Sequence, residues 1–120
     1  MSATLLLQNI GAGLSLVVGL NGLLRPVHMG KAVGLEYSNL VGLVEIRVLF
    51  GSFLVALPIY ALWRQQSELF VFFGIAALAA FIIKTSFTIL DKCPWPLIRV
   101  GILVDAVLAL CLLSPWYLPF

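Results

Sequence analysis

Four long apolar segments divide the chain, at about residues 3–24, 41–63, 69–90 and 97–118. Each has roughly the 20 residues that a helix needs to cross the hydrocarbon core of a bilayer. Strands of a membrane barrel would be shorter and would alternate apolar with polar positions, which these segments do not. The pattern therefore predicts an all-α integral membrane protein: a four-helix bundle of up-down-up-down topology, forming a single domain over residues 1–120.

The links between the segments favour a compact bundle. Residues 64–68 and 91–96 are tight connections, and the second contains two prolines that end one helix and begin the next. Residues 25–40 form a longer link, which we expect to lie along the membrane surface. All three links are short enough to make consecutive helices neighbours.

Small residues and one proline indicate how the helices meet. Gly11, Ser15 and Gly19 recur at four-residue spacing, which allows close backbone approach in lipid. Smaller sets of the same kind occur in the third and fourth segments: Ala76, Ala80, Gly101 and Ala109. Pro58 cannot donate a backbone hydrogen bond, so it should free the Leu54 carbonyl and kink the second helix.

The composition excludes several classes of protein. Hydrophobic residues make up 62% of the chain, and only seven Lys or Arg and five Asp or Glu are present. Soluble domains have about 25% charged residues, so a soluble enzyme, a nucleic-acid binder and a disordered chain are all excluded. The net charge of +2 is too small to indicate a polyanionic partner. The expected partners are membrane lipids, together with a homo-oligomer or a larger membrane complex.

The basic residues predict an orientation. Arg25, Lys31, Lys92 and Arg99 fall on one side of the predicted bundle, and Arg64 alone falls on the other. Because Lys and Arg accumulate on the cytoplasmic side of a membrane, both termini should face the periplasm.

Charged residues inside the apolar segments are the candidates for function. Glu45, Arg47, Lys84 and Asp105 lie on three segments at similar depths, about 6 to 12 Å from the cytoplasmic ends at ~1.5 Å per residue. Each unpaired charge at mid-membrane costs roughly 2.5–3.5 kcal/mol. Because the four charges sum to zero, we hypothesise that they form a polar cluster inside the bundle. Asp105 is too short to reach water, so it should be either protonated or paired with Arg47 or Lys84.

The four charged residues need not all belong to one cluster, because their directions on the helices and the lengths of their side chains allow other arrangements. Glu45 and Arg47 point roughly 200° apart at ~100° per residue, so one of them should face a neighbouring helix, a second subunit or the headgroups. Lys84 and Arg47 have stems long enough to reach the headgroups, and the cluster could be purely structural. Secondary polar candidates nearer the cytoplasmic surface are Asn21, Thr88 and Arg99.

Neither a metal nor a cofactor is expected. His28 is the only histidine, whereas zinc takes three or four protein ligands. Cys93 and Cys111 are predicted to lie toward opposite membrane faces as free thiols.

The stretch Glu45–Gly51, with the sequence EIRVLFG, resembles the Glu-x-Arg-x-x-Tyr-Gly pattern of a family of small bacterial four-helix membrane proteins of unknown function. These proteins are DoxX-like in layout, and Phe50 stands where that pattern has Tyr. The resemblance continues through Lys84, at a commonly basic position, and Asp105, at a commonly acidic one. It implies a bacterial inner-membrane protein and adds no reaction.

Three functions follow from these residues. The first is a binding or accessory protein that holds a lipid, an apolar small molecule or a partner membrane protein beside the charged cluster. The second is a membrane-embedded enzyme that uses Glu45 or Asp105 as acid or base. The third is a small proton-coupled transporter, although the first segment carries no acidic residue.

Overall fold

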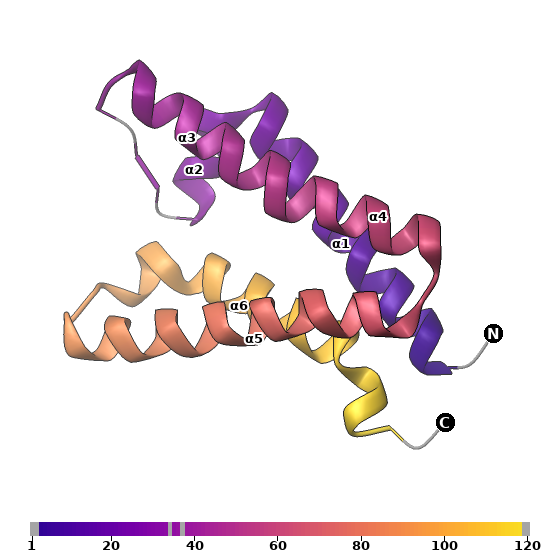
Figure 1. The fold of residues 1–120 in the computed structure, drawn as a ribbon. Coiled ribbons are helices and arrows are strands. Elements are labelled where there is room, and N and C mark those ends of the chain that lie inside the picture. The colour runs from indigo at the N-terminus through magenta and orange to yellow at the C-terminus, as the bar shows by residue number, and fades with distance from the viewer. Residues whose placement is uncertain (1–2, 34, 37, 119–120) are drawn as a thin grey trace.

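The computed structural model describes residues 3–33, 35–36 and 38–118, and these contain helices but no strand, as the apolar pattern predicts. In chain order the elements are α1 (Ala3–Leu24), α2 (Pro26–Val33), α3 (Leu40–Gly51), the π-helical η1 (Ser52–Ala56), α4 (Leu57–Arg64), α5 (Ser67–Leu90), α6 (Trp95–Leu112) and the 3₁₀ turn η2 (Ser114–Trp116). Consecutive long helices alternate in direction (Figure 1).

Among the residues that the structure describes, three helices are long and apolar enough to cross a membrane: α1, the continuous helix Leu40–Arg64 and α5. Their bounds agree closely with the predicted segments. The fourth predicted segment differs, because α6 ends at Leu112 rather than at residue 118. Pro115 has no N–H to continue the helix, and the chain turns into η2 instead.

The long link between the first two predicted spans contains helix α2. Pro26 and Gly30 are buried on this helix, which packs against α1, α3 and α6. The Leu35 N–H donates to the Gly30 carbonyl at 2.6 Å and closes the end of α2. Helix α2 is therefore part of the packed structure.

Helix α1 is the element that the other helices share, and its small residues make close contact possible. A Cβ on Gly11 would lie 2.8 Å from the Cβ of Cys111 on α6. A Cβ on Gly19 would lie 2.8 Å from the carbonyl carbon of Leu54 in η1. The predicted role of the small-residue stripe in helix packing is confirmed.

Pro58 has no backbone N–H and interrupts the regular hydrogen bonding of the helix Leu40–Arg64. The Leu57 N–H donates to the Ser52 carbonyl, which is the wider hydrogen bond of a π-helix. The Leu54 carbonyl, which has no partner at Pro58, accepts a hydrogen bond from Ser15 Oγ on α1 at 3.0 Å. The carbonyl group that Pro58 leaves without a backbone donor therefore forms a hydrogen bond between η1 and α1.

A buried amide joins the start of α1 to two other helices. Gln8 is fully buried, and its Nε2 donates to the Leu112 carbonyl at the end of α6 at 3.1 Å. Ser67 Oγ at the start of α5 donates to Gln8 Oε1 at 3.2 Å. The N-terminal part of α1, the start of α5 and the end of α6 therefore lie together at one end of the molecule (Figure 1).

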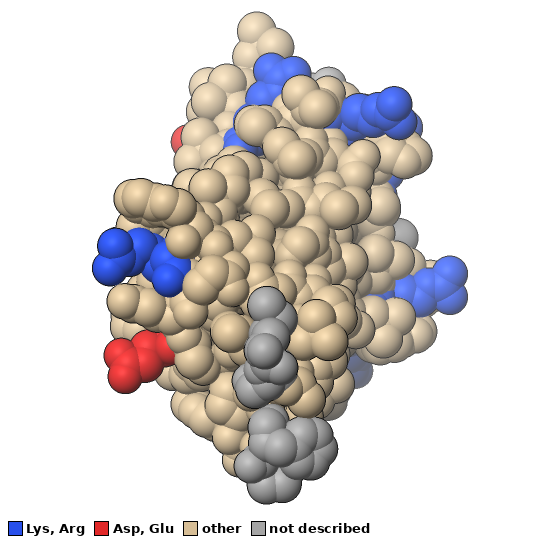
Figure 2. Space-filling model, turned by 90° about the vertical axis from the view of Figure 1, so that its right-hand side faces the viewer, with Lys and Arg blue, Asp and Glu red and all other residues tan. Residues whose placement is uncertain are grey.

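The outer surface is largely apolar. Leu40, Phe72 and Ile89 are 76%, 79% and 73% exposed, and in Figure 2 charged side chains are few and scattered over an otherwise uncharged face. Soluble monomers rarely expose contiguous apolar surface on this scale. The apolar surface and the three apolar helices are compatible with a membrane-embedded protein.

The contact of α1 with η1 gives a direct test of the packing. We expect Gly19→Ala to lower the free energy of unfolding by about 1–3 kcal/mol, because the added methyl group meets backbone that has little room to move. Gly13→Ala is the matched control: a Cβ there meets nothing within 4 Å, and Ala favours the helix by up to about 1 kcal/mol. Thermal unfolding in detergent, followed by circular dichroism, measures both. A Gly19→Ala protein as stable as Gly13→Ala would contradict the close approach.

Candidate functional site

An ion pair joins α5 to α6 across their shared interface. Lys84 Nζ lies 2.6 Å from Asp105 Oδ2. Gly101, one turn before Asp105 on α6, leaves the space that the lysine head occupies, since a Cβ on Gly101 would lie 3.3 Å from Nζ. The absent side chain at Gly101 therefore lets a long cation on α5 reach a short anion on α6.

The two members of the pair differ in burial. The Asp105 side chain is 13% exposed and that of Lys84 is 39% exposed. Asp105 Oδ2 is buried and accepts no well-directed hydrogen bond within the described residues, so the nearby ammonium is its electrostatic partner. Attraction between opposite charges strengthens as the surrounding dielectric falls. The expectation that Asp105 pairs with Arg47 or Lys84 is confirmed for Lys84.

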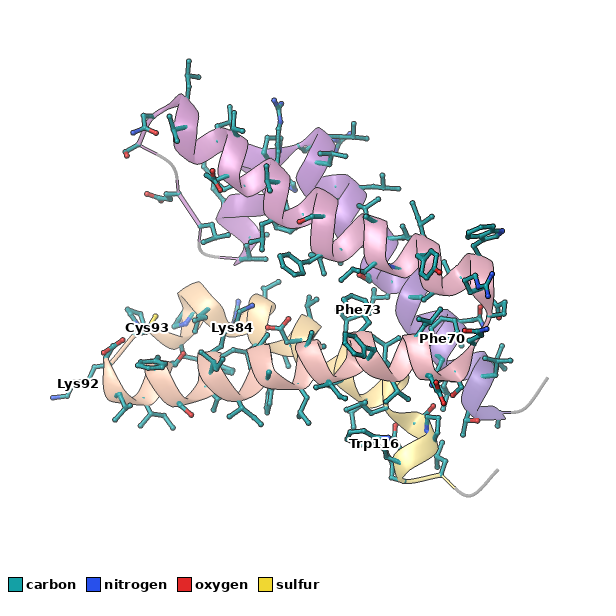
Figure 3. The ribbon with its side chains drawn as sticks, in the orientation of Figure 1. Phe70, Phe73, Lys84, Lys92, Cys93 and Trp116 are labelled. Atoms are coloured by element: carbon teal, nitrogen blue, oxygen red, sulfur yellow. The ribbon has the colours of Figure 1, made fainter. Side chains whose placement is uncertain are left out.

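The ion pair forms part of the wall of an apolar groove of about 360 Å³. One wall comes from α1, α2, the loop after α2, α3 and η1, and the other from α5 and α6. The lining residues are Val18, Val33, Leu35, Leu49, Phe50, Phe53, Leu54, Phe73, Ala76, Ala77, Ala80, Lys84, Gly101, Val104, Asp105 and Leu108. Figure 3 shows Phe73 and Lys84 on the side of α5 that is turned toward the other helices.

The groove exists because the two helical layers meet through α1 and diverge from each other. Helix α5 packs extensively on α6, and α3 packs on α1, but among the described residues α3 contacts neither α5 nor α6. Helix α2 contacts both α3 and α6 and so bridges the layers on one side. Ala76 and Ala80 border the groove, so their small side chains contribute to its open volume.

Glu45 and Arg47 do not join the ion pair, and this corrects the hypothesis of a four-residue cluster. Ile46 and Phe50 are buried and define the inward face of α3. At ~100° per residue, the positions on either side of Ile46 turn away from that face. Glu45 and Arg47 are both exposed, and neither borders the groove.

The secondary candidates also lie apart from the pair. Asn21 Nδ2 donates to the Val17 carbonyl at 2.9 Å on its own helix. Thr88 Oγ1 donates to the Lys84 carbonyl at 2.6 Å, which is a contact with the backbone and not with the ammonium. Arg99 is exposed on α6. None of the three lines the groove.

The aromatic residues of the groove could not be predicted from the sequence. Phe50, Phe53 and Phe73 stand in segments that are apolar throughout, so no contrast in polarity distinguishes a groove residue from one that faces lipid. The signal in the sequence was the similar depth of four charged residues, of which Lys84 and Asp105 border the groove.

The remaining candidates for chemistry are isolated. Within the described ranges, no three His, Cys, Asp or Glu side chains lie close enough together to hold a metal ion. Cys93 and Cys111 are both free thiols. His28 is exposed on α2.

Comparison of the chain with known protein families, curated proteins and solved structures finds no match. The groove and its ion pair are therefore the basis for assigning a function.

Removing one member of the ion pair should cost more than removing both. Asp105→Asn leaves a lysine without its anion, and we expect a loss of about 2–3 kcal/mol, between the values for exposed and buried pairs. Adding Lys84→Met should recover much of that loss, because the unpaired cation is removed. A double-mutant cycle of thermal stability in detergent measures the coupling. If Asp105→Asn is as stable as the parent protein, the pair does not stabilise the fold.

Proposed function

We propose that this protein is a binding protein of the bacterial inner membrane that holds a lipid or an apolar small molecule in the groove beside Lys84 and Asp105. The observation that carries the proposal is the groove itself. It is almost entirely apolar, its volume of about 360 Å³ falls in the range of small-molecule sites, and one ion pair provides its polar contacts.

In this proposal α6 is the fourth membrane-spanning helix. Its 18 residues extend about 27 Å at ~1.5 Å per residue, close to the ~30 Å hydrocarbon core. The placing of both termini in the periplasm is supported by the basic residues at the opposite end of the bundle. The bacterial inner membrane is supported by the resemblance to proteins of DoxX-like layout.

Binding fits the site better than acid–base catalysis does. Glu45, one of the two carboxyl candidates for an enzyme, lies outside the groove. Asp105 borders it but is engaged with Lys84, whereas a general acid or base must exchange a proton with the substrate. Asp105 nevertheless remains the residue through which a catalytic alternative would act.

Glu45 and Arg47 support the proposal that the protein also contacts a partner in the membrane. Both are exposed on a helix that is long and apolar enough to cross the membrane, where isolated charges are costly. A second copy of the chain or another membrane protein is the partner that would pair them.

Filling the groove should block binding. Ala80 lines the groove and Ala79 beside it is exposed and does not, so Ala80→Leu and Ala79→Leu form a matched pair. We expect a photoreactive dodecanol, added to the protein in lipid nanodiscs, to label groove residues in the parent protein and in Ala79→Leu. Labelling should fall several-fold in Ala80→Leu, because the larger side chain occupies the ligand's volume.

Mass spectrometry of the labelled peptides measures this result, and circular dichroism checks that all three proteins are folded. Equal labelling of the groove in Ala80→Leu and Ala79→Leu would contradict a ligand site in the groove. Labels spread evenly over lipid-facing positions would do the same.

The orientation can be tested with the natural and one introduced cysteine. In Cys111→Ala protein, Cys93 should resist a membrane-impermeant maleimide added to intact cells, because the α5–α6 link is placed in the cytoplasm. Gln66→Cys, in a chain with both natural cysteines replaced, should react, because the α4–α5 link is placed in the periplasm. Labelling of Cys93 together with protection of position 66 would reverse the orientation.

A further inference from the structure

The charge of the groove narrows the class of ligand. Lys84 and Asp105 are the ionisable residues among those that line it, and at 2.6 Å they neutralise each other. Building on the proposed function, we propose that the groove selects amphipathic molecules with an uncharged head that carries a hydroxyl or a carbonyl group, and rejects those with a net charge.

The ion pair retains hydrogen-bonding capacity for such a head. An ammonium has three N–H donors and a carboxylate has about four acceptor sites. Among the described residues, the lysine head has no contact with a hydrogen-bond acceptor apart from Asp105, and 39% of the Lys84 side chain is exposed. A hydroxyl can accept from Lys84 and donate to Asp105, and a carbonyl can accept from Lys84.

A charged head would meet a penalty that an uncharged one avoids. An anionic head beside Lys84 would compete with Asp105 and leave a net negative charge in the groove. A cationic head beside Asp105 would leave a net positive charge. Both cost free energy in a site with little water. The charges of α3 and α6 that could offset them, Glu45, Arg47 and Arg99, are exposed and do not border the groove.

The apolar part of the groove has room for a chain. Lys84 and Phe73, which both line it, are 11 positions apart on α5, or about 16 Å at ~1.5 Å per residue. The head group lies toward the end of α5 that leads to the α5–α6 link, and the tail lies toward Phe73 and Leu54. The ligand is therefore an elongated molecule with one polar end.

Three photoreactive probes with the same dodecyl chain test this selection in nanodiscs. They carry a hydroxyl, a sulfonate and a trimethylammonium head, whose charges do not change with pH. In the parent protein we expect the hydroxyl probe to label the groove about tenfold more than either charged probe, since a net charge in a desolvated site costs at least 1.4 kcal/mol. Asp105→Asn should shift the preference to the sulfonate probe, and Lys84→Gln should shift it to the trimethylammonium probe.

Asp91→Asn and Lys92→Gln are the matched controls, because they make the same substitutions at exposed positions that do not border the groove. Both should retain the preference of the parent. Equal labelling by all three heads, or strongest labelling by a charged head in the parent, overturns the selection while leaving the binding site intact. Absence of groove labelling by every probe overturns the proposed function itself. The comparison in the parent protein decides the matter even where a charge variant fails to fold.

Discussion

The close approach of α1 to its neighbours is the constraint on which the rest of the structure depends. Gly19 admits the backbone of η1, and Gly11 admits α6, so both helical layers are held against one central helix. Because α3 and α5 do not contact each other in the described structure, the space between the layers is the groove. A larger residue on the packed face of α1 would change the separation of both layers, and so would alter the site without touching it.

The Pro58 break and its hydrogen bond belong to the same arrangement. A free carbonyl inside a membrane costs several kcal/mol unless it finds a donor. Ser15 Oγ provides that donor at 3.0 Å, from a position one turn before Gly19 on α1. The π-helical segment contains Phe53 and Leu54, which form part of the wall of the groove. The break at Pro58 thus has two consequences. It lets η1 form a hydrogen bond with α1, and it places two residues of η1 in the wall of the groove.

Among the described residues that line the groove, Lys84 and Asp105 are the ionisable ones, and the position of the pair fits recognition better than stability alone. Well-packed apolar residues can replace a buried ion pair with little loss of stability, so a bundle of this composition has no evident need for it. The pair instead places a donor and an acceptor beside an apolar space, where hydrogen bonds are strong because water is scarce. The proposed function and the proposed preference for uncharged heads both follow from that combination.

The sequence by itself determined the helical class, three long apolar helices to within two residues, and the small-residue contacts of α1. These follow from apolar length and local spacing, which do not depend on how the helices are arranged. The sequence also narrowed the partner of Asp105 to two cations. Only the tertiary structure chose Lys84, because Ile46 and Phe50 turn α3 so that Arg47 faces outward, while Gly101 leaves room for the lysine. The groove was likewise decided by the tertiary structure: in segments that are apolar on every side, polarity cannot tell a lipid-facing phenylalanine from one that lines a cavity.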